Sequence, residues 1–98
     1  MGTYYILEGK TPKPVPNMME WARWFETADR HVAKTMLPNG VRVSTVFQGL
    51  DHSFDGDTPL LFETMIFSGR YNDYQARYST WEEAKAGHIK AVKLAEVD

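Results

Sequence analysis

Apolar residues gather in two runs near the middle of the chain, residues 41–48 and residues 60–67. Successive side chains of an extended strand point to opposite faces, and each run has the length of one strand. The second run then places Glu63 on a face whose other members are all apolar. An isolated buried carboxylate is costly, so we expect Glu63 to be hydrogen-bonded, paired with a cation or placed at the rim of a sheet.

Helical spacing of apolar residues marks two further segments. Asn17 is followed by Glu20, and Thr80 by Glu83, at the spacing of a helix N-cap residue and its partner. The first pattern predicts a helix that ends at about residue 30, and the second predicts a helix that ends at about residue 95.

Two side chains of these helices are candidates for more than packing. Trp24 lies at the edge of the first apolar arc, so we expect it to be half exposed, where it packs at a rim or stacks on a ligand ring. His88 lies inside the second apolar arc and must find a polar partner. We expect a histidine satisfied within the core, and the alternative is a contact with a carboxylate such as Glu63 or Asp51.

The remaining segments complete an α+β pattern. Residues 3–8 predict a strand, and the three prolines within residues 10–17 predict an extended connector rather than a strand. Pro38-Asn39-Gly40 predicts a hairpin turn between two apolar segments. The order β-α-β-β-β-α predicts a four-stranded, mainly antiparallel sheet, whose first strand joins by a crossover through the first helix, with two amphipathic helices packed on one face.

Composition narrows the class of protein. The 98 residues predict one domain, residues 1–98, and the absence of cysteine excludes disulfide and thiol chemistry. The formal net charge of −2 argues against a general nucleic-acid binder. No segment has the apolar length of a membrane helix, and no signal peptide is visible. We therefore expect a cytoplasmic protein with no membrane partner and no cofactor.

An acidic loop separates the two apolar runs. Asp51, Asp55 and Gly56 have the spacing of the first half of a calcium-binding loop. The twelfth position of such a loop is a bidentate glutamate, but here it is Phe62, and the flanking segments predict strands rather than helices. We expect no metal site and interpret the loop as a solvated turn.

Residues 70–78 are polar and rich in tyrosine. Aromatic rings interleaved with arginines can hold a nucleotide by stacking and charge, or simply cover the edge of a sheet. With the two helical side chains and the inward carboxylate, the candidate ligand-binding residues are Trp24, Glu63, Arg70, Tyr74, Arg77, Tyr78 and His88.

Four segments carry a resemblance to a known family: EWARWFETADRHVAKT (residues 20–35), VRVSTVFQGLDHSF (41–54), PLLFETMIF (59–67) and RYSTWEEAKAGH (77–88). They resemble a family of small proteins encoded in bacteriophage and prophage genomes, over roughly residues 4–92. The resemblance implies an accessory protein that acts by binding in the cytoplasm of the bacterial host. The partner that it implies is a host protein that is blocked, or a nucleotide-like defence signal that is sequestered.

Three functions remain open. The first, ranked highest, is a non-enzymatic binding protein, which would form a homodimer if the uncovered sheet face were apolar. The second is a structural or assembly protein of a phage. The third is a small enzyme that uses Asp51, His52, Glu63 and His88 for acid–base chemistry, although no catalytic, phosphate-binding or zinc motif fixes their geometry.

Overall fold

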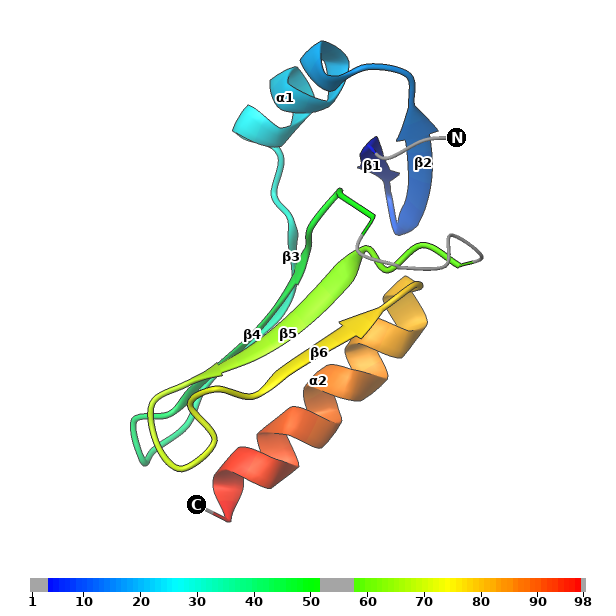
Figure 1. Ribbon diagram of the computed structural model, residues 1–98. Helices are drawn as coiled ribbons and strands as arrows, with labels where there is room; N and C mark the ends of the chain where they lie inside the picture. The colour runs from blue at the N-terminus through cyan, green and yellow to red at the C-terminus, as the bar shows by residue number, and fades with distance from the viewer. Residues whose placement is uncertain (1–3, 52–57, 98) are drawn as a thin grey trace.

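The computed structural model describes residues 4–51 and 58–97. The fold is α+β, as predicted, with two helices and two antiparallel sheets (Figure 1). In chain order the elements are β1 (Tyr4–Glu8), β2 (Thr11–Val15), α1 (Met18–Thr27), β3 (His31–Met36), β4 (Arg42–Phe47), β5 (Phe62–Phe67), β6 (Gln75–Tyr78) and α2 (Trp81–Glu96).

The larger sheet has four strands in the order β3-β4-β5-β6, and each neighbouring pair is antiparallel. The predicted four-stranded antiparallel sheet is therefore confirmed. The predicted turn between β3 and β4 forms as well, because the Leu37 N–H donates to the Val41 carbonyl over 2.9 Å. Gly40 takes a positive φ of 88° there, which glycine adopts without steric cost.

Helix α2 covers one face of this sheet and contacts all four strands (Figure 1). It begins after the N-cap Thr80, whose hydroxyl accepts from the Glu83 N–H, while the Glu83 carboxylate accepts from the Thr80 N–H. This is the predicted capping box. Small residues on its inner face let the helix approach the sheet closely; its buried residues are Ala84, His88, Ala91 and Ala95.

The core between α2 and the sheet has two apolar clusters. One gathers around Val43 and Ile66, and the other gathers around Phe47 and Phe62. All four side chains are fully buried. Burial of each such side chain stabilises the fold by about 1.5–3 kcal/mol.

The first strand does not join the larger sheet, contrary to the predicted order. β1 pairs with β2, which is the proline-rich segment expected to be a connector, and β6 supplies the fourth strand of the larger sheet instead. The Tyr5 N–H donates to the Gly49 carbonyl, so Tyr5 and Pro14 form a non-hydrogen-bonded pair. The missing N–H of Pro14 therefore costs no ladder bond, which lets the segment be a strand.

Helix α1 also differs from the prediction. It ends at Thr27 rather than near Arg30, because Ala28 is extended with ψ of 143°. Most of its contacts are with β1 and β2, and its Trp24 ring meets Phe47 of β4, so only α2 covers the larger sheet. Arg30 no longer belongs to the helix and donates from Nη1 to the Phe47 carbonyl over 3.0 Å.

Gly49 joins the N-terminal hairpin and α1 to the end of the larger sheet. Its φ is +78°, and a Cβ built there would lie 2.6 Å from the Trp21 Nε1 and 3.0 Å from the Tyr5 carbonyl oxygen. The close approach of the indole and the positive φ both require glycine at this position.

Candidate ligand-binding site

A buried carboxylate lies on the sheet face that α2 leaves uncovered. Glu63 is only 5% exposed, and its two oxygens have different partners. The Gln48 side-chain amide donates to Oε1 over 2.6 Å, and the Arg77 Nε donates to Oε2 over 3.2 Å. The antiparallel register puts Arg77 directly opposite Glu63. The expectation that Glu63 is hydrogen-bonded or paired is confirmed.

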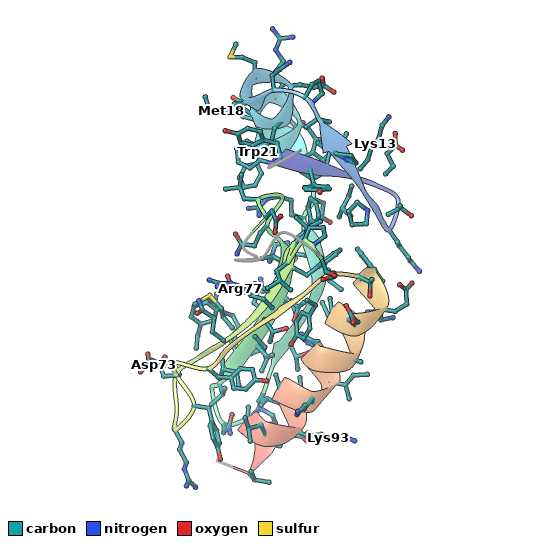
Figure 2. The ribbon with its side chains drawn as sticks, turned by 45° about the vertical axis from the view of Figure 1, so that its right-hand side comes forward. Lys13, Met18, Trp21, Asp73, Arg77 and Lys93 are labelled. Carbon is teal, nitrogen blue, oxygen red and sulfur yellow. The ribbon has the colours of Figure 1, made fainter. Side chains whose placement is uncertain are left out.

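This pairing fixes the orientation of Arg77. The side chain of Arg77 is 38% exposed, whereas that of Glu63 is 7% exposed. Only Nε is used, and the two terminal amino groups have no hydrogen bond within the described residues. A guanidinium held by one nitrogen still presents a planar pair of donors, which suits a carboxylate or a phosphate. Figure 2 shows Arg77 on the side of the sheet away from α2.

A groove of about 380 Å³ lies where β6 meets α2. From the strand side it is lined by Arg77, Tyr78 and Ser79, and from the helix side by Glu83, Gly87 and Lys90. The three helix residues are four and three positions apart, so they share one side of α2.

The charge left uncommitted at this groove is positive. The Glu83 carboxylate accepts the backbone N–H groups of Ser79 and Thr80, both over 3.2 Å, and is therefore engaged in the helix cap. Lys90 is exposed and has no ion pair within the described residues. Lys90 in the groove, and the terminal amino groups of Arg77 where β6 borders it on the uncovered face of the sheet, both favour an anionic group.

Tyr78 forms one wall of the groove because position 87 has no side chain. A Cβ built on Gly87 would overlap the hydroxyl and ring of Tyr78. The hydroxyl is buried and has no well-oriented hydrogen-bond partner among the described residues. Burial raises the pKa of Tyr78, and the nearby Thr64 hydroxyl opposes part of that shift. Tyr78 is therefore a neutral ring at physiological pH.

His88 occupies a polar layer between the two apolar clusters. Its Nε2 is 2.9 Å from the Thr35 hydroxyl, and its Nδ1 is 2.8 Å from the Thr45 hydroxyl. Thr45 is in turn 2.6 Å from the hydroxyl of Thr64. Burial lowers the pKa of His88, so the neutral ring is favoured.

The partners of His88 decide between the two predictions made for it. Both ring nitrogens contact threonines, so the expectation of a satisfied core histidine is confirmed, and the alternative of a carboxylate partner is wrong. Glu63 cannot serve, because its neighbour Thr64 faces α2 and alternation turns Glu63 to the opposite face. His88 therefore stabilises the core rather than the groove.

The remaining candidate residues are dispersed. Trp24 is half buried, as expected, and its ring packs edge-on against Phe47 with centroids 5.7 Å apart. Tyr74 packs against the apolar cluster around Val43. Arg70 lies in the loop before β6, 5.5 Å from the ring of Tyr71. Of the seven candidates, the structure pairs Glu63 with Arg77, and Arg77 and Tyr78 both line the groove from the end of β6.

The residues of the acid–base hypothesis are not assembled in the described part of the chain. Glu63 and His88 lie on opposite faces of the sheet. Asp51 accepts the Leu60 N–H over 3.1 Å, and His52 lies outside the described residues, as does the Asp55–Asp57 part of the acidic loop. No group of three or more histidine, aspartate or glutamate side chains within residues 4–51 and 58–97 is placed to hold a metal ion.

Several residues of the site were not among the candidates, including Gln48, Glu83 and Lys90. Gln48 follows β4 on the same face as Glu63. In the sequence, only the alternation of side chains along a strand indicated this position. Glu83 and Lys90 lie on the outer side of α2, where a charged residue is ordinary, so nothing in the sequence distinguished them. Their role depends on where β6 ends, which the sequence pattern did not locate.

Comparison of the chain with protein-family models, with curated proteins and with solved structures finds no match. Neither helix is long and apolar enough to cross a membrane within the residues that the structure describes.

Proposed function

We propose that this chain is a small non-enzymatic binding protein whose ligand docks on Arg77 at the groove between β6 and α2. One observation carries the proposal: Glu63 is buried, yet its bond to Arg77 leaves the terminal amino groups of that arginine at the surface, with no hydrogen bond to any residue that the structure describes. A buried carboxylate that only positions an exposed cation is the arrangement of a preorganised anion-binding site.

Binding is favoured over catalysis by the chemistry of these groups. An arginine side chain stays protonated in proteins and does not act as a proton donor or acceptor at neutral pH. Glu83, the carboxylate that lines the groove, is engaged in the helix cap. The groove thus offers charge and shape, without a positioned acid–base pair.

The resemblance to phage and prophage proteins gives the proposal its setting. The ligand class proposed from it is a host protein or a small nucleotide-like signal in the cytoplasm of the bacterial host, which the chain would block or sequester as a counter-defence factor. Both classes present carboxylates or phosphates, which match the donors of Arg77.

The test is affinity capture from a bacterial lysate with two matched variants. Arg77→Gln and Lys93→Gln each remove one positive charge, but Lys93 lies in the last turn of α2, away from the groove (Figure 2). We expect wild type and Lys93→Gln to capture the same protein or small molecule, and Arg77→Gln to lose it. An identical set of captured species for wild type and Arg77→Gln would overturn the proposal.

Self-association in an assembly is the second candidate. It is supported by apolar side chains on the uncovered sheet face, where Met36 is 65% exposed and Met65 and Phe67 are half buried. Arg42 stacks on Phe67 at 4.4 Å, so part of this apolar area is already covered within the chain. Because this stacking covers part of the apolar area, we rank self-association below ligand binding.

A further inference from the structure

Strand β6 is an edge of the larger sheet, and part of its backbone faces outward. The Ile66 N–H donates to the Tyr74 carbonyl over 3.3 Å, so these two residues form a hydrogen-bonded pair. Such pairs recur at every second residue of an antiparallel ladder, which makes the Thr64–Ala76 pair hydrogen-bonded too. The backbone N–H and C=O groups of Gln75 and Arg77 therefore point away from β5.

The two edges of the sheet differ in how open they are to pairing. β3, the other edge, has an irregular register between His31 and Ala33 and carries Lys34, both devices that discourage a further strand. β6 is in regular register with β5 at all four residues and contains no proline. The β6 edge is thus the one left able to accept a strand.

The groove that favours an anionic group lies along this same edge. The groove runs between the end of β6 and the side of α2 that carries Gly87 and Lys90. Arg77 points to the uncovered face of the sheet, and the next residue, Tyr78, points toward α2. A strand laid beside β6 would therefore meet a cation on one face and an aromatic wall on the other.

We propose that the ligand is an extended peptide segment of a partner protein, which adds to β6 as a fifth strand of the sheet. An acidic side chain of the segment pairs with the free amino groups of Arg77. The adjacent side chain is apolar and lies in the groove against Tyr78 and Gly87. Main-chain bonds to Gln75 and Arg77 supply affinity, and the alternating side chains supply specificity. This inference rests on the proposed function and names its ligand class.

The test begins with a displayed library of short random peptides, selected on the wild-type protein and counter-selected on Arg77→Gln. We expect enriched peptides to carry an aspartate or glutamate next to an apolar residue. Two N-methylated copies of the best peptide are then compared, one methylated at odd positions and one at even positions. Only one edge of the peptide pairs with β6, so one copy should bind about tenfold more weakly or worse, and the other should keep its affinity.

The outcomes separate this inference from the proposed function. Equal binding by both N-methylated copies, or no Arg77-dependent peptide, would overturn strand addition. If strand addition fails while Arg77→Gln still abolishes capture of a nucleotide from the lysate, the proposed function stands and only the peptide class is wrong. If Arg77→Gln changes neither capture nor peptide binding, both are wrong.

Discussion

A polar layer in the core is formed by Thr35, His88, Thr45 and Thr64. The role of each of these side chains is set by its hydrogen-bond partners. The Thr45 hydroxyl lies between His88 at 2.8 Å and Thr64 at 2.6 Å, in a core with no exposed surface at either threonine. A polar layer of this kind is costly only when a member lacks a partner.

Replacement of Thr45 by valine keeps the shape of the side chain and removes its hydroxyl. His88 and Thr64 then each lose a partner inside the core, and we expect a loss of about 1–3 kcal/mol in unfolding free energy. The matched control is Ser44→Val, on the opposite face and half buried, which should change stability by about 0.5 kcal/mol or less. Urea unfolding measures both. Equal losses for the two variants would contradict the role given to the layer.

The pKa of His88 makes stability depend on pH. Burial lowers the folded-state pKa below the ordinary 6.5, so the unfolded chain binds a proton more readily than the native protein. The stability that neutral His88 contributes is complete above pH 6.5 and is lost as pH falls from there toward the folded pKa. We expect His88→Gln to flatten this part of the stability curve, measured by urea midpoints. His31→Gln, at an exposed site, should not flatten it.

Sequence reasoning reached some residues of the site and missed others for a definite reason. The need of Glu63 for a partner followed from alternation within one strand. Its actual partners, Gln48 and Arg77, come from two other segments, so they depended on register. The same limit explains His88: its inward direction was readable from helical spacing, but the two threonines that contact it lie on two different strands, β3 and β4.

At the scale of elements, long periodic segments were predictable and short ones were not. α2 and the β3–β4 hairpin match the predicted segments because caps and turn residues mark their ends. β2 was missed because prolines normally exclude a strand, and here only the pairing with β1 shows that their missing N–H groups face away. β6 has four residues, too few for a periodic signal.

The packing of α2 on β6 predicts that replacing a helical glycine by alanine lowers the stability of this protein, the opposite of its usual effect. Alanine is a better helix former than glycine by about 1 kcal/mol, so Gly87→Ala should stabilise an isolated helix. In this protein the added Cβ would overlap the Tyr78 ring, so we expect a net loss of stability and a disturbed groove. Thermal unfolding measures it.

The control for that helix effect is the neighbouring exposed residue Ala86. Ala86→Gly should cost about the propensity difference alone, roughly 1 kcal/mol. A Gly87→Ala variant that is more stable than wild type would show that Tyr78 does not pack against position 87.

The two faces of the larger sheet have different roles in the molecule. α2 closes one face of the sheet with a core that includes the His88 layer, and the N-terminal hairpin with α1 closes the end of the sheet at Gly49. The other face and the β6 edge carry the Glu63–Arg77 pair and the groove. This division places the pre-oriented guanidinium of Arg77 on the side of the sheet opposite the core under α2.

Native mass spectrometry of protein purified from bacterial cells tests ligand binding at Arg77 most directly, because one spectrum reports the number of subunits and any retained molecule. We expect wild type to retain a protein partner or a small molecule, and Arg77→Gln to be a bare chain of the same fold. A bare chain for both proteins would contradict ligand binding at Arg77. The same homo-oligomer for both, with nothing else bound, would contradict it too and would favour the assembly role.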